Sequence, residues 1–227
     1  MGKVLEKAKC RLFQKLRWEI SDERVLQAME RVPRERFLPP ESRHLAYEDI
    51  PLTIGRGQTI SQPFIIAVMT SALGLRDFER VLEVGTGSGY QVAILSLMVP
   101  RGRVVTVERV PALAQRAQKI LGLLGYDNVE VQGATPILGC PEEGPYDAIV
   151  VTAASPRLPQ GLVDQLAPGG RLIIPIGTLE DQELVRVLKT GEGLSLSYLG
   201  LCRFVPLIGL EAWPNDRHWP LRSIDAL

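Results

Sequence analysis

Residues 81–90 read Val-Leu-Glu-Val-Gly-Thr-Gly-Ser-Gly-Tyr, and no other stretch of the chain says more about its fold. A short apolar run leads into Gly85, Gly87 and Gly89, and further apolar residues follow over 90–98. Glycines at a strand-to-helix turn let the backbone bend sharply and let a ligand approach main-chain N–H groups. The stretch predicts a strand, a ligand-binding turn and a helix; a tight turn without a ligand is the alternative.

A second landmark is Glu108, which closes the next apolar run over 104–107. An acidic residue about 20 positions after a glycine turn is placed to bind a ribose diol. The third glycine comes one residue earlier than in the dinucleotide pattern, and Glu83 adds a carboxylate that would repel a pyrophosphate. A cofactor with a cationic ammonium or sulfonium group suits Glu83 better. The residues therefore favour S-adenosylmethionine over a nicotinamide dinucleotide.

Length and charge limit the class of protein. A chain of 227 residues is long enough for one α/β domain with a modest appendage. Its 26 basic and 26 acidic residues balance, which gives no electrostatic reason for binding nucleic acid or an anionic membrane. The chain lacks an apolar run typical of a signal peptide or a membrane span. We expect a cytoplasmic protein with no nucleic-acid or membrane partner.

Cysteines and histidines are few and scattered. Cys10, Cys140 and Cys202 are far apart and form no C-x-x-C pair, so we expect buried or half-buried thiols. The two histidines, His44 and His218, are also distant in sequence. We therefore expect no metal site and no paired-histidine catalytic device.

From residue 80 onward the hydrophobic pattern alternates between strands and helices. Strands are expected over 80–84, 103–108, 129–132, 146–152 and 171–175, and helices over 90–98, 111–124 and 159–166. Continuous apolar strands such as 148–151 are typical of a parallel sheet that is buried on both faces. The pattern predicts a doubly wound, mostly parallel α/β sheet of the Rossmann-like kind.

We expect a single domain over residues 1–227, in three parts: an N-terminal helical and lid segment (1–79), a cofactor-binding core (80–177), and a C-terminal antiparallel hairpin with a tail (178–227). Helices are expected over 4–18, 22–31 and 63–73, and hairpin strands over 183–189 and 195–205. The proline-studded stretch 32–63 reads as irregular, which is typical of a lid or binding loop. The tail over 215–227 has no clear period.

Several segments carry a family resemblance. Residues 57–63 read Gly-Gln-Thr-Ile-Ser-Gln-Pro, and residues 203–209 read Arg-Phe-Val-Pro-Leu-Ile-Gly. Together with 32–37, 44–49, 146–154 and 166–172, they closely resemble the protein-L-isoaspartate O-methyltransferase family, a class I S-adenosylmethionine-dependent family. The resemblance covers about 25–213. Many methyltransferases share the glycine motif, whereas 57–63 and 203–209 are specific to this family.

The resemblance implies a reaction. The family transfers a methyl group from S-adenosylmethionine to the free carboxylate of L-isoaspartyl residues in damaged proteins and peptides, which begins their repair. S-adenosylhomocysteine is the product, and no metal is needed. A carboxylate is already ionised at pH 7, so the reaction requires no general base, and the lack of a histidine pair agrees with it. We expect isoaspartyl proteins and peptides as partners and a monomeric enzyme.

The resemblance also implies site residues. Ser61 is the catalytic residue and binds substrate by orienting the acceptor carboxylate; the alternative is a helix N-cap, because Gln62 and Pro63 follow it. Val205 and Pro206 supply backbone groups to the isoaspartyl peptide; the alternative is an apolar strand end. The expected cofactor-binding residues are Thr59, Glu83, Gly85, Gly87, Ser88, Gly89, Glu108, Gly133 and Ala134.

One position departs from the family pattern. After the third strand the family usually carries Gly-Asp-Gly, whose aspartate accepts a hydrogen bond from the adenine amino group, whereas this chain has Gly133, Ala134 and Thr135. The change predicts weaker cofactor binding. It leaves a second hypothesis open: a divergent, weakly active or inactive relative that serves as an S-adenosylmethionine-binding module. A Rossmann oxidoreductase is disfavoured by the glycine spacing.

Three further polar features have local interpretations. Arg56 lies between two glycines, which is typical of a solvated loop tip, and a carboxylate clamp is the alternative. Asp147 opens a strand and is expected to cap or pair locally. Residues 47–49 (Tyr-Glu-Asp) are expected to hold the lid in place.

Overall fold

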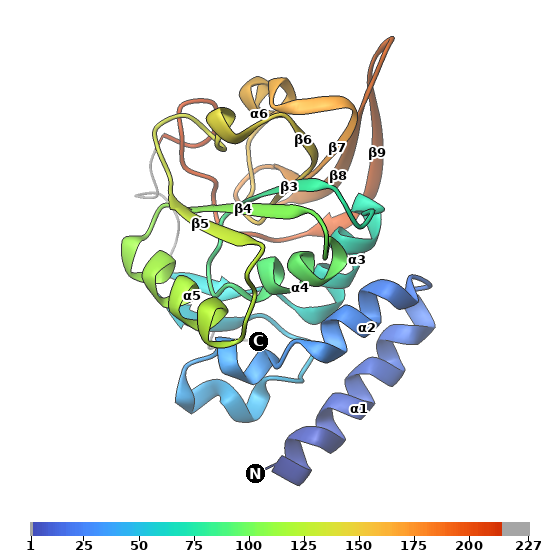
Figure 1. Cartoon of the computed structure of the whole chain (residues 1–227), viewed down its shortest axis with the longest axis vertical. Coiled ribbons are helices and arrows are strands. Elements are labelled where there is room, and N and C mark those ends of the chain that lie inside the picture. The colour runs from blue at the N-terminus through green and yellow to red at the C-terminus, as the bar shows by residue number, and fades with distance from the viewer. Residues whose placement is uncertain (1, 215–227) are drawn as a thin grey trace.

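Residues 2–214 are the part of the chain that the structure, a computed structural model, describes, and seven strands within them form one sheet (Figure 1). The strands are β3 (Arg80–Val84), β4 (Arg103–Glu108), β5 (Val129–Gly133), β6 (Tyr146–Val151), β7 (Leu166–Gly177), β8 (Gln182–Thr190) and β9 (Gly193–Cys202). Their spatial order is β5-β4-β3-β6-β7-β8-β9. Strands β3 to β7 are parallel, and β8 and β9 are antiparallel. The predicted fold class is confirmed; the tail and His218 lie outside the described residues.

Alternate residues of the central strands point to opposite faces of the sheet and build two apolar cores. On one face Val81 and Val104 pack with apolar residues from the helical segments between residues 8 and 121. On the other face Leu82 and Val105 pack with residues of the short helix α6 (Gln160–Asp164). Because both faces are covered, the strands read as continuous apolar runs in the sequence.

Three helices surround the first strands of the sheet: α3 (Pro63–Leu73), α4 (Tyr90–Met98) and α5 (Pro111–Leu123). Pro63 and Pro111 occupy the first helical turns, where a missing N–H costs nothing. Gly74 and Gly125 follow α3 and α5 with positive φ angles of 55° and 74°, the usual conformation at a helix end. The predicted bounds of α3 and α4 are confirmed, and that of α5 differs by one residue.

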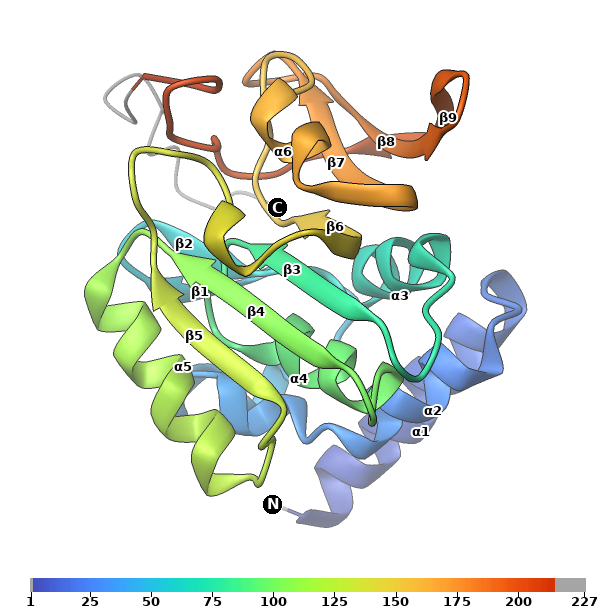
Figure 2. The same ribbon diagram turned by 45° about the horizontal axis from the view of Figure 1, so that its top comes forward.

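Two further helices open the described chain. Helices α1 (Gly2–Glu19) and α2 (Glu23–Arg31), blue in Figures 1 and 2, lie side by side, and α2 packs against α4. Asp22 is the N-cap of α2, and its side chain accepts a hydrogen bond from Val25 N. Two short 3₁₀ helices, η1 (Arg34–Phe37) and η2 (Pro40–Leu45), continue the chain towards the sheet.

The lid segment is more regular than predicted. Strands β1 (Leu52–Gly55) and β2 (Gln58–Ile60) form an antiparallel hairpin where an irregular stretch was expected. Arg56 and Gly57 make its turn with φ angles of 58° and 70°, as a two-residue type I′ turn requires. Strands of four and three residues are too short to show a clear alternation, and this turn lacks the usual Asn-Gly or Asp-Gly signal. Arg56 is exposed at the tip, in agreement with the solvated interpretation.

The predicted C-terminal hairpin is confirmed, but some helices and strands of this part end at other residues than predicted. Helix α6 stops at Asp164, before the predicted 166, because Leu166 already pairs with Tyr146 of β6. Strand β9 ends at Cys202 rather than at 205. Beyond it, Phe204 N donates a 2.7 Å hydrogen bond to the buried side chain of Gln182 in β8 instead of to a backbone carbonyl of that strand. The chain therefore leaves β9, and residues 205–207 pair with Ala154, just after the end of β6.

We expect Gly102→Ala to destabilise the protein because a Cβ there would lie 2.1 Å from the carbonyl oxygen of Glu79, which is backbone and cannot move aside. Overpacking of this kind costs roughly 1–3 kcal/mol. Gly122→Ala is the matched control, because no atom lies within 4 Å of its Cβ on the exposed face of α5; alanine there should stabilise by up to about 1 kcal/mol. Urea unfolding of both variants is the measurement, and equal effects would contradict the packing argument.

Candidate active site

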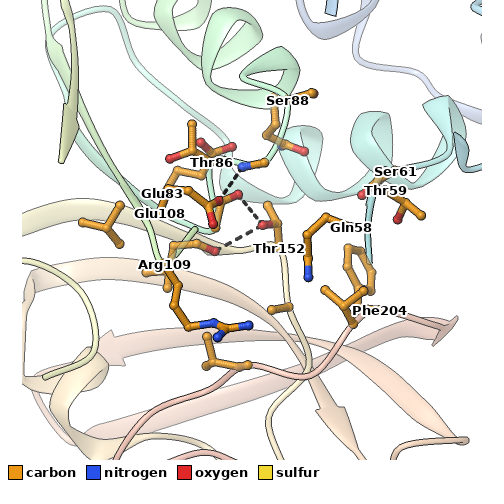
Figure 3. Close-up of a pocket in the computed structure, with 18 of the residues that line it drawn as sticks. Gln58, Thr59, Ser61, Glu83, Thr86, Ser88, Glu108, Arg109, Thr152 and Phe204 are labelled. Atoms are coloured by element: carbon orange, nitrogen blue, oxygen red, sulfur yellow. Dashed lines mark hydrogen bonds between the residues drawn. The ribbon is translucent and has the colours of Figure 1, made fainter. Parts of the chain in front are cut away.

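A cavity of about 310 Å³ opens at the carboxyl ends of β3, β4 and β6. Ten of the expected site residues are part of its wall: Thr59, Ser61, Glu83, Gly85, Gly87, Ser88, Glu108, Ala134, Val205 and Pro206. Figure 3 shows that the labelled side chains come from the lid hairpin and the residues after it, from β3 and the glycine turn, from the ends of β4 and β6, and from the segment after β9. Segments far apart in the sequence therefore meet around one space.

Gly89 and Gly133 are not part of the cavity wall. Gly89 precedes α4 with a φ of 89°, and a Cβ there would lie 3.2 Å from the Cβ of Ala117 in α5. This glycine lets the two helices pack closely. Gly133 ends β5 and pairs with Glu108 in the sheet. Both residues shape the neighbourhood of the cavity rather than its surface.

The glycine turn is fixed from both sides. Gly85 has a φ of 102°, and a Cβ on it would lie 2.3 Å from Oγ1 of Thr152. That hydroxyl donates to the carbonyl oxygens of Gly85 (2.6 Å) and Val84 (3.2 Å). On the opposite side Gly87 N donates to Glu108 Oε2 at 2.8 Å (Figure 3). Only glycine combines this conformation with these close approaches.

Glu108 ties two turns together. Besides Gly87 N, it accepts a 2.8 Å hydrogen bond from Val110 N through its other oxygen. The side chain is buried, yet it forms part of the cavity wall. A carboxylate has about four acceptor positions, so acceptor capacity remains after these two bonds. Glu108 is thus rigidly held and suited to accept hydrogen bonds from the hydroxyls of a ribose.

Glu83 lies fully buried in the wall beside it. Oε2 accepts a 2.5 Å hydrogen bond from Thr106 Oγ1, while Oε1 has no partner among the described residues. Burial raises the pKa of this carboxyl group to about 8, with a further increase from the nearby Glu108 charge. An unpaired buried oxygen is costly. It is also a ready acceptor for a cationic ligand group, so the wall fits a cofactor that carries an ammonium.

Ser61 does not cap α3. The N-cap position of α3 is Gln62, which makes no side-chain capping bond, and Asp49 Oδ1 instead accepts a 2.9 Å hydrogen bond from Phe64 N. Asp49 also pairs with Lys15 Nζ at 3.1 Å. The predicted role of residues 47–49 in holding the lid agrees with these contacts. The competing interpretation of Ser61 as the cap is wrong, and its hydroxyl is available to the cavity.

The loop after β5 brings Ala134 into the wall. Ala134 N donates to Glu108 O at 2.9 Å, so the backbone of this loop is held next to the end of β4. Ala134 presents only a methyl group to the cavity. Thr135 Oγ1 donates to Ile137 O at 3.1 Å, which shapes the loop. Ser88 accepts a hydrogen bond from Tyr90 N through Oγ at the start of α4.

Further wall residues were not given a role from the sequence: Gln58, Thr86, Arg109 and Thr152 (Figure 3). Phe204, in the segment expected to bind the peptide, is also part of the wall. Thr152 follows a parallel strand directly, and the position just after such a strand is a signal that could have found it. Asp147 accepts a 2.8 Å hydrogen bond from Arg80 N. This contact agrees with the expectation that Asp147 pairs locally.

The three cysteines are free: Cys140 is buried and Cys202 half-buried, as expected, whereas Cys10 on α1 is exposed, against the expectation. No group of three or more His, Cys, Asp and Glu side chains in residues 2–214 could hold a metal ion. Over the same residues, every helix is too short or too polar to cross a membrane.

The doubly wound sheet with an acidic, glycine-lined cavity at its carboxyl edge defines a class I, Rossmann-like methyltransferase. A family model described as protein-L-isoaspartate(D-aspartate) O-methyltransferase matches residues 7–212, and the chain belongs to that family. It is 51% identical over 197 residues to a protein-L-isoaspartate O-methyltransferase of Methanoculleus marisnigri, covering 87% of this chain and 89% of the relative. A protein-L-isoaspartate O-methyltransferase 2 of Pelobacter propionicus is 53% identical over 197 residues, covering 86% of each chain.

A solved structure has the same fold. It is a putative protein-L-isoaspartate O-methyltransferase from Plasmodium falciparum in complex with S-adenosyl-L-homocysteine. The TM-score is 0.76 at 29% sequence identity, and the match covers 87% of this chain and 96% of the other.

Glu83 should make the stability of the ligand-free protein depend on pH. The folded protein keeps this proton up to about pH 8, whereas an unfolded glutamate releases it near pH 4.3. Unfolding therefore releases a proton between these values, and the free energy of unfolding falls as the pH rises from about 4.3 to about 8. Glu83→Gln should remove this fall. Urea unfolding of both proteins from pH 5 to pH 8 tests it, and a constant difference between them would contradict it.

Ala134→Asp should tighten cofactor binding. Ala134 faces the cavity, where a carboxylate could accept a hydrogen bond from the adenine amino group. A hydrogen bond to a charged group contributes about 1.5–3 kcal/mol, or roughly ten- to hundredfold in affinity. Titration calorimetry with S-adenosylhomocysteine compares the parent, Ala134→Asp, and Ala134→Asp combined with Thr135→Gly, which frees the loop. Equal or weaker binding in both variants would show that this loop does not face adenine.

Proposed function

We propose that this protein transfers a methyl group from S-adenosylmethionine to the free carboxylate of L-isoaspartyl residues in damaged proteins and peptides. One observation carries the proposal: a single cavity joins the acidic glycine turn, which suits the cofactor, to Ser61, whose hydroxyl is not used as a cap. Family membership and relatives about 50% identical over most of the chain support the same reaction.

The cavity residues divide the work of the reaction. When bound, S-adenosylmethionine supplies a methyl group on a positively charged sulfur, so that one S–C bond breaks while one O–C bond forms. Glu83 holds the cationic end and Glu108 the ribose hydroxyls. Ser61 donates a hydrogen bond that orients the acceptor carboxylate, and backbone groups of Val205 and Pro206 hold the peptide.

The chain needs no general base for this step, because the acceptor carboxylate is ionised at neutral pH. The protein must instead align the acceptor oxygen with the methyl group and exclude water from the cavity. Together these two effects can lower the activation barrier by several kcal/mol. Apolar wall residues such as Ile60 and Phe204 exclude water from the cavity. The absence of histidine from the cavity wall, as far as the described residues go, agrees with such a mechanism.

A second candidate function is motivated by Ala134. Loss of the adenine acceptor would suit a protein that binds S-adenosylmethionine but transfers methyl groups slowly or not at all. The half of the cavity that contains Ser61 and the segment 203–207 argues for the enzyme instead. Both segments resemble the family's substrate-binding parts, which a protein that only binds the cofactor would not need.

Transfer of labelled methyl from S-adenosylmethionine tests the proposal directly. We expect an isoaspartyl peptide to be labelled and its aspartyl twin of the same sequence to remain unlabelled. Cofactor binding by calorimetry without transfer to either peptide would reject the enzyme and leave the binding module.

Ser61→Ala should leave the fold and cofactor affinity nearly intact while slowing methyl transfer. Loss of one orienting hydrogen bond costs on the order of 1–3 kcal/mol, or roughly ten- to hundredfold in rate. Ser71→Ala is the matched control: Ser71 lies in α3, the helix that follows Ser61, but outside the cavity wall, and its buried hydroxyl has no partner among the described residues. Parent-like kinetics in Ser61→Ala, or equal losses in both variants, would count against the serine.

The setting in which the protein acts is part of the same proposal. We infer a monomer in the cytoplasm that acts on proteins and peptides and not on nucleic acids. The balanced charge of 26 basic and 26 acidic residues supports it. Light scattering after gel filtration tests the oligomeric state.

A further inference from the structure

Arg34 lies in an unusual position for a charged side chain. It belongs to the 3₁₀ helix η1 and is fully buried. Its Nε donates a 2.9 Å hydrogen bond to Ala46 O, and its Nη2 donates a 2.8 Å hydrogen bond to Ser61 O. The guanidinium thus holds the backbone of the residue whose hydroxyl orients the acceptor.

The same guanidinium contacts the cofactor side of the cavity. Its central carbon lies 4.9 Å from the centroid of the Tyr90 ring, a distance at which a cation is attracted to the aromatic face. Tyr90 is the first residue of α4, directly after the glycine turn, and forms part of the cavity wall. Phe37 packs edge-on against the same ring at 5.6 Å. One side chain therefore touches both halves of the cavity.

This placement is costly for stability alone. Burial lowers the pKa of Arg34, and its Nη1 has no hydrogen-bond partner among the described residues. Removing a charge from water without full pairing is unfavourable. A neutral donor would satisfy the two carbonyls at lower cost. The planar, rigid fork of arginine offers what a neutral donor does not, namely simultaneous contact with two carbonyls and an aromatic face.

We propose that Arg34 is a positioning residue for methyl transfer, which fixes the Ser61 loop relative to α4 and the glycine turn. The proposal rests on the proposed function, and on Ser61 as the residue that orients the acceptor. Displacement of reacting groups by about 1 Å can cost as much as a hundredfold in rate, so a contact that sets this separation should appear in the rate of transfer. It should appear much less in cofactor affinity.

Arg171 provides a matched control. It is also a buried arginine next to α3, but at the opposite end of that helix. It donates to the carbonyl oxygens of Leu73, Gly74 and Asp147 and pairs with Glu79. It is not part of the cavity wall. Replacing it with lysine disturbs a comparable set of buried bonds without touching Ser61 or Tyr90.

The experiment compares Arg34→Lys and Arg171→Lys, each alone and combined with Ser61→Ala. Melting temperature, calorimetric affinity for S-adenosylhomocysteine, and kcat and KM for an isoaspartyl peptide are measured for every variant. Both lysine variants should melt at a lower temperature. Only Arg34→Lys should reduce kcat, by about tenfold or more, with cofactor affinity changed by less than about threefold. In the Ser61→Ala background, its effect on kcat should fall below about threefold because the two residues act together.

Several outcomes separate this proposal from the proposed function. Full activity of Arg34→Lys, or a loss of kcat that persists unchanged in the Ser61→Ala background, would overturn the positioning role while leaving the methyltransferase intact. An equal loss of kcat in Arg171→Lys would also overturn it. An inactive parent would reject the proposed function itself. If Arg34→Lys does not fold, Arg34→Gln takes its place in the same comparison, because glutamine retains an amide donor for Ser61 O.

Discussion

The reversal of strand order at β3 is the constraint on which the site depends. Strand β4 pairs with one side of β3 and β6 with the other, so the chain segments that leave these strands diverge. A crevice must open between such segments at the carboxyl edge of a parallel sheet. Every cavity residue discussed above reaches it from a strand end or from a segment laid across that edge. The two apolar cores hold the strands in place, and the crevice follows from their order.

Two carboxylates at this edge differ because their surroundings differ. Glu108 accepts two backbone N–H bonds, one on each oxygen, which hold its carboxylate in place. Glu83 has one hydroxyl donor and an unpaired oxygen in the apolar interior, so burial favours its neutral form. A bound cation would supply the missing partner of Glu83. The free energy gained when it does so offsets the cost of ionising the buried group, a cost that the ligand-free protein avoids at neutral pH by keeping Glu83 protonated.

Elements with strong local signals were predictable from the sequence. The bounds of β3, β4, α3 and α4 follow from apolar period, prolines at helix starts and glycines at turns, and the structure agrees with each of them. The β1–β2 hairpin was missed because its strands are short and its turn is formed by Arg56 and Gly57. Of the site, the glycine turn and both carboxylates were identified by spacing. Ser61, Val205 and Pro206 required the family resemblance, since nothing in their local pattern distinguishes a site from a cap or a strand end.

The cap of α3 shows why local reasoning fails there. A serine before Gln-Pro is a good capping signal, yet the acceptor for Phe64 N is Asp49, 15 residues away along the chain. Such a bond forms only after the lid has folded back onto the helix, so no window of neighbouring residues reveals it. Because Asp49 satisfies the helix end, and Arg34 holds the carbonyl of Ser61, the backbone of this serine is fixed while its hydroxyl remains unengaged by the helix. A rigid backbone with a free polar group is what an orienting residue needs, and the lid provides both.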